Sequence, residues 1–273
     1  MMIKDFKLFE EQLKNTIDSY VFENYLPKFD KIQNIEINGR HPYEGYQRGW
    51  GIQFSETSSH FDDLKQLILS DPAFIIAYEA AKEFTVVSPE NRMNQFLIMK
   101  YFVNRLEPGD FIEFGSYKGG NAIFLAILAK IFGYESKIYA CDTFEGMPET
   151  NQSIDMHNEG DFSDANYEIL QDYIAQFKLD NLVLVKGLFE DSLKKPEMQN
   201  LHFRYAHIDC DIESACDVSY AYVRDKMVKG GYIIFDDATV SSCIGATSFV
   251  ETTLIQKEKK LSEQIWPHFV FRA

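Results

Sequence analysis

Acidic side chains stand where two short apolar runs of the sequence end. The run Ala206–Ile208 is followed by Asp209, and the run Tyr232–Phe235 is followed by Asp236 and Asp237. If the two runs are neighbouring parallel strands, the three carboxylates converge at one sheet edge, where they cannot all stay ionised without a cation. All-oxygen ligation favours Mg²⁺, Mn²⁺ or Ca²⁺ over zinc. The alternative is that one aspartate caps a helix and another pairs with a Lys or Arg.

A second group of residues surrounds a glycine-containing turn after the run Phe111–Phe114. Gly115 and Gly119 allow the backbone to turn tightly and to approach a ligand before a helix begins. Their spacing differs from the G-x-G-x-x-G that holds a dinucleotide pyrophosphate. Glu113 would repel a phosphate but suits a cationic or amino-bearing ligand. The alternative is a structural turn with a partly exposed Glu113.

Two more strand ends carry candidate ligand contacts. Asp142 follows the run Ile138–Cys141, and a carboxylate there can accept both hydroxyls of a ribose or can cap a helix. After Leu182–Val185, backbone groups around Gly187 and the ring of Phe189 can frame an adenine. The alternative for Phe189 is a place in the hydrophobic core.

The elements that must position these residues alternate between strand and helix from residue 110 onward. The alternation predicts an α/β fold with a doubly wound, mostly parallel sheet and helices on both faces. Two runs in the tail predict an antiparallel C-terminal hairpin, which would make a seven-stranded sheet. The predicted strands are 111–114, 138–141, 182–185, 206–208, 232–235, 261–265 and 268–272, and the predicted helices lie near 121–133, 163–177 and 213–228.

The residues before this region predict a mainly helical N-terminal extension or cap, 1–87, ahead of a domain that spans 88–273. Helical periodicity covers Phe6–Tyr20 and Phe61–Phe84. Ser88 and Pro89 predict the start of another helix, which ends before residue 108. The aromatic and glycine-rich stretch Gly45–Gly51 is either a substrate lid or a turn-rich connector.

Composition excludes several classes of protein. The 273 residues include 27 Lys+Arg and 42 Asp+Glu, for a formal charge of −15, so we expect no nucleic acid partner. The longest apolar stretch, Ala122–Ala129, is too short to span a membrane, and the N-terminus lacks the apolar run of a signal peptide. Four cysteines without a C-x-x-C pair indicate reduced thiols. We therefore expect a cytoplasmic protein with small-molecule or protein partners.

The strand-end blocks together resemble the class I S-adenosylmethionine-dependent methyltransferases. More narrowly, they resemble the macrocin O-methyltransferase family, which methylates sugar hydroxyls of macrolide antibiotics. The resemblance covers about residue 88 to the C-terminus, and its first block is also similar to that of the Mg²⁺-dependent catechol-type O-methyltransferases. The blocks are Pro108–Gly115 with Lys118–Gly120, Asp142–Pro148, His207–Ser214 and Gly230–Asp237.

The resemblance implies roles for individual residues. The cofactor would be S-adenosylmethionine, with Asp142 on its ribose, and the metal would be Mg²⁺ on Asp209, Asp236 and Asp237. The implied cofactor contacts are Glu113, Gly115, Tyr117, Gly119, Asn121, Asp142, Thr143, Gly187 and Phe189. The sequence departs from the family at Cys210, where Gly is usual, and at Ile212 and Ala238, where Tyr is usual.

The function implied is that of a Mg²⁺-dependent O-methyltransferase acting on a hydroxyl of a sugar or sugar-bearing small molecule. A Mg²⁺ ion on two vicinal hydroxyls lowers their pKa and positions one oxygen for attack. Asp209 is the expected base, with His207 as a second candidate or as a structural residue. The loop Met147–Phe162 is either a lid or a plain surface loop. Family habit also indicates a homo-oligomer.

Two functions from other classes remain open. An NAD-dependent sugar oxidoreductase would use the same sheet and Asp142, although the sequence lacks the G-x-G-x-x-G motif. A catalytically inactive binding protein built on the methyltransferase fold is the other. The intact glycines and the three aspartates argue against such decay.

Overall fold

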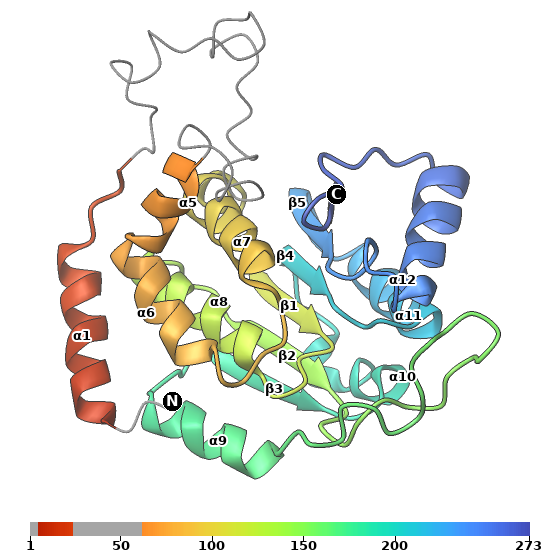
Figure 1. Cartoon of the computed structure of the whole chain (residues 1–273), viewed down its shortest axis with the longest axis horizontal. Coiled ribbons are helices and arrows are strands. Elements are labelled where there is room, and N and C mark those ends of the chain that lie inside the picture. The colour runs from red at the N-terminus through yellow and green to blue at the C-terminus, as the bar shows by residue number, and fades with distance from the viewer. Residues whose placement is uncertain (1–4, 24–61) are drawn as a thin grey trace, which may run out of the picture.

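A six-stranded sheet forms the centre of the molecule (Figure 1). The computed structural model describes residues 5–23 and 62–273. The strand order is β3-β2-β1-β4-β5-β6, with all neighbours parallel except β6, which runs antiparallel to β5. The prediction of a mostly parallel α/β sheet is therefore confirmed. The strands are β1 (Asp110–Phe114), β2 (Ile138–Asp142), β3 (Leu182–Lys186), β4 (Phe203–Ile208), β5 (Met227–Phe235) and β6 (Phe269–Arg272).

The C-terminal tail differs from the sequence prediction. The described residues form six strands rather than seven, because 261–265 makes only an isolated bridge from Gln264 to Val270. The side chain of Ser262 takes part of the pairing that a second strand would need: its hydroxyl accepts from the Val270 amide at 3.1 Å and donates to the Val270 carbonyl at 3.0 Å. Local side-chain bonds of this kind compete with a ladder. The tail therefore adds one antiparallel edge strand and no hairpin.

Helices cover both faces of the sheet, as the doubly wound prediction requires. Alternating strand residues divide between two cores, so that Phe111 packs into one and Ile112 into the other. The helices of the first face are α6 (Pro72–Ala81), α7 (Pro89–Tyr101), α8 (Gly120–Ile131) and α9 (Tyr167–Gln176). The second face carries α10 (Phe189–Ser192), α11 (Glu213–Val223), α12 (Ile244–Ser248) and the π-helix Phe249–Lys257. Short 3₁₀ turns lie at Val103–Arg105 and Pro196–Met198.

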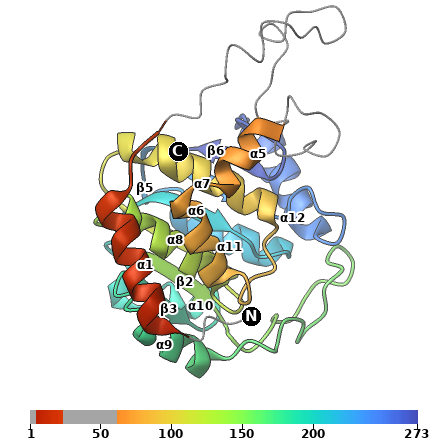
Figure 2. The same cartoon turned by 60° about the vertical axis from the view of Figure 1, so that its left-hand side comes forward.

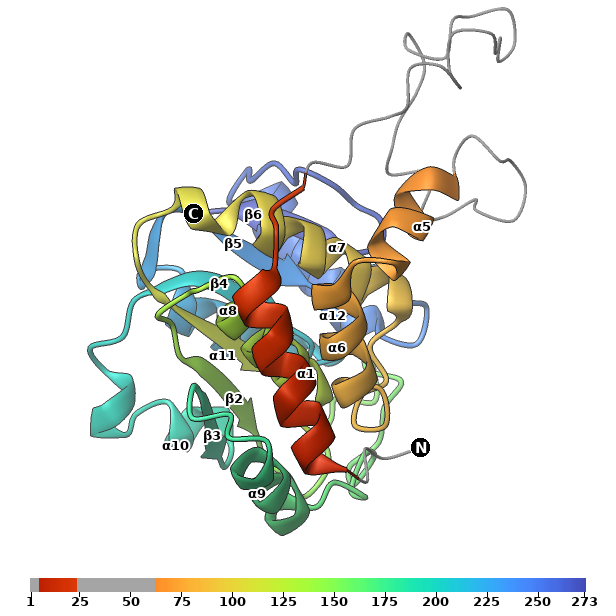
Figure 3. The same ribbon diagram turned by 90° about the vertical axis from the view of Figure 1, so that its left-hand side faces the viewer.

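The first face is thickened by two more helices, α1 (Phe6–Ser19) and α5 (Asp62–Leu69). Figures 2 and 3 show α1 lying outside α6 and α8, away from the sheet. Phe9 and Leu13 of α1 join the same apolar cluster as α8. This second layer explains why Ala122–Ala129 of α8 is fully buried on every side. The division of the chain at residue 87 stays a prediction.

The helix starts follow the sequence signals. Ser88 accepts a hydrogen bond from the amide of Asn91 at 3.1 Å, with Pro89 in the first turn, which confirms the predicted start of α7. The helical run predicted over 61–84 is divided at Asp71, whose carboxylate accepts from the Ala73 amide and begins α6. The stretch Gly45–Gly51 lies outside the described residues. Among the described residues, no helix combines the length and the apolar surface that crossing a membrane requires.

One glycine sets how closely two strand ends approach. Gly115, directly after β1, has a φ of 84°, and a Cβ built on it would lie 1.6 Å from the carbonyl oxygen of Asp209 after β4. Only a residue without a side chain allows this approach. The turn after β1 therefore packs backbone against backbone on the turn after β4.

We expect Gly115→Ala to destabilise the fold by at least about 2 kcal/mol more than Gly133→Ala. Gly133 also has a positive φ, of 69°, but a Cβ there meets no described atom within 4 Å, so it controls for backbone strain alone. Urea unfolding followed by circular dichroism measures both variants. Equal losses of stability would contradict the assigned contact with Asp209.

Candidate functional site

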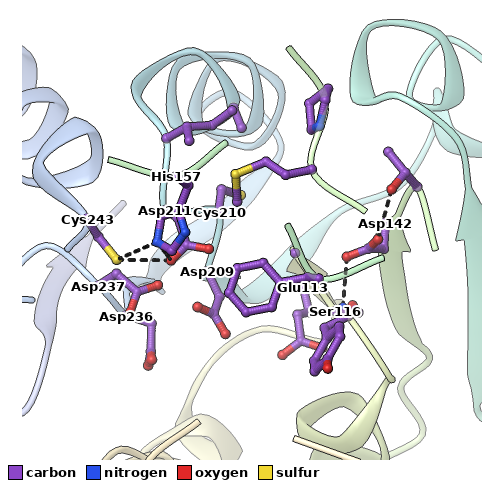
Figure 4. A pocket seen from close by; sticks show the side chains of 18 of the residues that line it. Glu113, Ser116, Asp142, His157, Asp209, Cys210, Asp211, Asp236, Asp237 and Cys243 are labelled. Carbon is purple, nitrogen blue, oxygen red and sulfur yellow. Dashed lines mark hydrogen bonds and ion pairs between the residues drawn. The ribbon is translucent and has the colours of Figure 1, made fainter. Parts of the chain in front are cut away.

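A cavity of about 350 Å³ opens beyond the carboxyl ends of β1, β2, β4 and β5. This is the place where open parallel sheets bind ligands. Figure 4 shows Glu113, Ser116 and Asp142 on one side of it and Asp211, Asp237, His157 and Cys243 on the other, with Asp209 between. We call these the Glu113 side and the aspartate side.

Buried oxygens without partners mark the Glu113 side. Glu113 is fully buried, so the alternative of a partly exposed side chain is wrong. Its Oε1 accepts from the side-chain amide of Asn121 at 2.7 Å, whereas its Oε2 has no partner among the described residues. Asn121 Oδ1 and Ser116 Oγ are buried and equally unpartnered there. Each such atom costs roughly 1–3 kcal/mol unless a ligand satisfies it. The two acceptors fit a ligand that donates hydrogen bonds, above all an ammonium group.

Asp142 is held in place by the backbone around it. Its carboxylate accepts from the amide of Tyr117 at 2.8 Å and from that of Phe144 at 2.6 Å. Tyr117 and Phe144 both lie outside the helices, so Asp142 holds two turns and does not cap a helix. Burial raises the pKa of Asp142, and the two amide bonds oppose that rise. Thr143 closes the turn by donating to the carbonyl of Gly146 at 2.6 Å, and it lines the cavity.

The other predicted cofactor contacts divide into two groups. Gly115, Tyr117 and Phe189 line the cavity, whereas Gly119 and Gly187 are outside its lining. Phe189 also packs edge-on against Phe114, with ring centroids 5.4 Å apart, so its ring serves both the core and the cavity. Gly119 is the N-cap of α8, and its φ of 77° allows the turn between β1 and α8.

The aspartate side brings together the predicted metal ligands. Because β4 and β5 are neighbours, Asp209, Asp236 and Asp237 each offer an oxygen within 4.8 Å of the others. Burial raises the pKa of Asp209, and the charges of Asp237 and Asp236 raise it further. Burial and Asp237 likewise raise the pKa of Asp211 to about 7. Asp237 Oδ2 is buried without a partner in the described part of the chain. A hard divalent cation fits this donor set, because it supplies the missing positive charge.

His207 joins the two sides beneath the cavity. It is fully buried, and its Nδ1 lies 3.1 Å from Glu113 Oε1 while its Nε2 lies 3.0 Å from Asp236 Oδ1. Burial alone would lower its pKa, but the bonds to Asp236 and Glu113 raise it to about 10. His207 is therefore an imidazolium that donates to both carboxylates. It does not line the cavity, so it acts as a structural residue rather than as a base for a bound ligand.

A second histidine, which sequence reasoning missed, completes this network. His268 Nδ1 lies 3.2 Å from Asp236 Oδ1, and Asn94 donates to His268 Nε2 at 2.7 Å. Burial raises the pKa of Asp236, but its bonds to His207 and His268 outweigh this and lower it. Asp236 is thus paired by histidines, not by the Lys or Arg of the alternative. Glu113 and His207 are paired residues of the neighbouring strands β1 and β4, so their contact could have been predicted from the alternation of side chains along the two strands.

The long connection between β2 and α9 forms a wall of the cavity. Met147, His157 and Phe162 line it. Asp155 is buried and accepts from the amide of Glu213 at 3.1 Å, which attaches the connection to the start of α11. The segment Met147–Phe162 is therefore more than a surface loop, and its movement as a lid stays a prediction.

The family of the chain is established by a comparison with known proteins. The model of the family described as Macrocin-O-methyltransferase (TylF) matches residues 82–265, which is more than half of the chain. The chain belongs to the macrocin O-methyltransferase family. Two curated relatives are similar over half of the chain. One is a tetracenomycin 4'-O-methyltransferase from Streptomyces olivaceus, named as acting on 8-demethyl-8-(2,3-dimethoxy-alpha-L-rhamnosyl)-tetracenomycin-C, with 23% identity. The other is mycinamicin III 3''-O-methyltransferase from Micromonospora griseorubida, with 22% identity. The matched region spans 55% and 58% of their lengths.

Solved structures place the fold among class I methyltransferases. The O-methyltransferase NovP aligns with a TM-score of 0.58 at 16% identity, covering 69% of this chain and 81% of NovP. The calicheamicin methyltransferase CalS11 aligns with a TM-score of 0.54 at 19% identity, covering 81% of this chain and 95% of CalS11. At such identities the likeness establishes the fold, while function must be argued from the site.

Replacing His207 tests the buried bridge. We expect His207→Gln to lower the free energy of unfolding by about 3 kcal/mol or more, because it leaves two buried carboxylates without their counter-charge. The double variant Glu113→Gln with His207→Gln should lose less than the sum of the two single variants, by at least about 1 kcal/mol. Urea unfolding of all four proteins measures this coupling. Strictly additive losses would contradict the bridge.

Proposed function

We propose that the protein transfers a methyl group from S-adenosylmethionine to a hydroxyl of a sugar or sugar-bearing small molecule, with a divalent cation, Mg²⁺, on its aspartates. One observation carries the proposal. A single cavity joins unpartnered buried acceptors around Glu113 to a cluster of carboxylates, in a chain of the macrocin O-methyltransferase family. The curated relatives are named as O-methyltransferases of sugar-bearing compounds, which supports this class of acceptor.

The Glu113 side would hold the methyl donor. The unpartnered oxygens of Glu113 and Asn121 would accept hydrogen bonds from the ammonium of its methionine part, and Asp142 would accept from the ribose hydroxyls. Gly115, Tyr117 and Thr143 line the same side, and Phe189 offers a ring face to an adenine. When bound, S-adenosylmethionine supplies a sulfonium methyl that an oxygen nucleophile can displace. Gly119 and Gly187 contribute through backbone shape.

The aspartate side would hold the cation and the acceptor. Asp209, Asp236 and Asp237 are the proposed ligands, and the unpartnered Asp237 Oδ2 is the atom that most needs a cation. A bound Mg²⁺ lowers the pKa of adjacent hydroxyls and orients them. His207 and His268 fix Asp236 from behind, so its carboxylate is oriented before any ligand binds.

Asp209 is the proposed base. It lies between the two sides and lines the cavity. Burial and the charges of Asp237 and Asp236 raise its pKa, and a bound cation would oppose that rise, so that the ionised carboxylate could accept the hydroxyl proton.

A transfer assay tests the function. With S-adenosylmethionine and Mg²⁺, we expect methyl α-L-rhamnoside to gain one methyl group by mass spectrometry, because its ring offers adjacent hydroxyls. The same sugar with its 2,3-diol blocked as an isopropylidene acetal is the matched control and should gain none. A panel of diol-bearing methyl glycosides extends the assay to other ring configurations. Methylation of the blocked sugar as fast as of the free one would contradict a diol-bound mechanism. Absence of transfer across the panel would contradict a sugar acceptor.

Removing one proposed metal ligand distinguishes the role of the aspartate side from that of the Glu113 side. We expect Asp237→Asn to reduce Mg²⁺-dependent turnover by about 100-fold while changing the dissociation constant of S-adenosylmethionine by less than about threefold. Asp225→Asn, an exposed aspartate that contacts Arg224, controls for the loss of a charge. Steady-state kinetics and calorimetry supply the two readouts. A turnover that stays independent of Mg²⁺ in both variants and in the unmodified protein would contradict the metal assignment.

A further inference from the structure

Three side chains with different metal-binding atoms meet at the outer end of the aspartate side. Cys243 Sγ lies 3.1 Å from Asp211 Oδ1 and 3.8 Å from His157 Nε2, and that nitrogen lies 4.0 Å from Asp211 Oδ1. All three side chains line the cavity, as Figure 4 shows. The proposed methyl transfer assigns no role to Cys243 or His157.

The three residues come from separate segments of the chain, which the fold brings together. Asp211 follows β4, Cys243 precedes α12, and His157 belongs to the connection between β2 and α9. Asp155, two residues before His157, is fixed by its bond to the Glu213 amide. Asp155 also packs against Gly245, where a Cβ would lie 2.1 Å from its Oδ1. The position of His157 therefore depends on buried contacts rather than on a free loop.

The triangle of donor atoms matches the size of a zinc site. Around a tetrahedral zinc ion, thiolate, imidazole and carboxylate atoms lie about 3.3–3.6 Å from one another. The three observed separations, 3.1, 3.8 and 4.0 Å, bracket these values. Side-chain rotations that move the atoms by a few tenths of an ångström would bring all three to bonding distance of one ion.

The chemistry of the donors also separates this group from its neighbour. Sulfur and imidazole nitrogen favour Zn²⁺ and related ions, whereas the all-oxygen set of Asp209, Asp236 and Asp237 favours Mg²⁺. The Cys243 thiol now donates its proton to Asp211. A metal ion would take the place of that proton, which leaves for solvent as the metal–sulfur bond forms. The carboxylate of Asp237, whose charge raises the pKa of Asp211, adds negative charge beside this group.

We propose that His157, Asp211 and Cys243 form a second metal site, selective for Zn²⁺ or a similar thiophilic divalent ion, with its fourth position toward the cavity. Three protein ligands and one open position are typical of zinc sites that bind water or a ligand oxygen. A bound ion would connect the segment between β2 and α9 to the turn after β4 and to the start of α12. The site stands whether or not the chain transfers methyl groups, because it rests only on these three side chains.

Cobalt substitution tests the site directly. The full chain, reduced and stripped with a chelator, is titrated with Co²⁺ in the presence of excess Mg²⁺, which occupies oxygen-only sites. We expect a thiolate-to-cobalt charge-transfer band in the near ultraviolet that saturates at equimolar Co²⁺. An equimolar amount of Zn²⁺ should then displace the cobalt and abolish the band. The band should be absent in Cys243→Ser. In His157→Ala the affinity for Co²⁺ should fall at least tenfold.

Cys210→Ser is the matched control, because Cys210 is the other buried thiol that lines the cavity. It should keep the band. Absence of the band in the unmodified protein, or its survival in Cys243→Ser, overturns the proposal. If circular dichroism shows that Cys243→Ser fails to fold, His157→Ala decides, because its partly exposed side chain can be removed without opening the core. An unchanged cobalt affinity in that variant also overturns the proposal. Calorimetry with S-adenosylmethionine on the same samples tests the cofactor independently.

Discussion

The protonated ring of His207 is the contact on which the two sides of the cavity depend. It lies wholly inside the protein between Glu113 and Asp236, at 3.1 and 3.0 Å. A buried carboxylate is tolerated only when it is paired, and here one imidazolium pairs two of them. The Glu113 side and the aspartate side are therefore connected through one buried charge.

The packing around the sheet explains why this polar network can exist at all. Glu113 and His207 face the layer of α7 and α8, where Gln95 and Asn121 supply further hydrogen bonds. Tyr205 reaches the same Gln95 oxygen at 3.0 Å. Apolar residues of α6 and, outside it, of α1 pack in the same cluster as α7 and α8. A network that is nearly complete holds its side chains in one arrangement, and its unpartnered oxygens belong to Glu113 and Asn121, which line the cavity.

Much of this arrangement can be predicted from the sequence, because strand ends and turn residues are local signals. The five parallel strands were predicted from apolar runs, and the convergence of Asp209, Asp236 and Asp237 from their places directly after two of those runs. In the tail, the strand predicted over 268–272 is present as β6, but 261–265 makes only a bridge, because Ser262 competes with the ladder through its own hydroxyl, which hydrophobic alternation does not reveal. His268 and Cys243 were missed for another reason. They reach the site from 32 and 34 positions beyond Asp236 and Asp209 in the chain, and only tertiary packing brings them there.

The most direct measurement is a calorimetric titration of S-adenosylmethionine into the full chain, first with a chelator present and then with Mg²⁺. We expect micromolar binding in both conditions, with one S-adenosylmethionine per chain, because the Glu113 side is complete without the metal. The absence of binding in both conditions would show that the Glu113 side of the cavity does not hold the methyl donor.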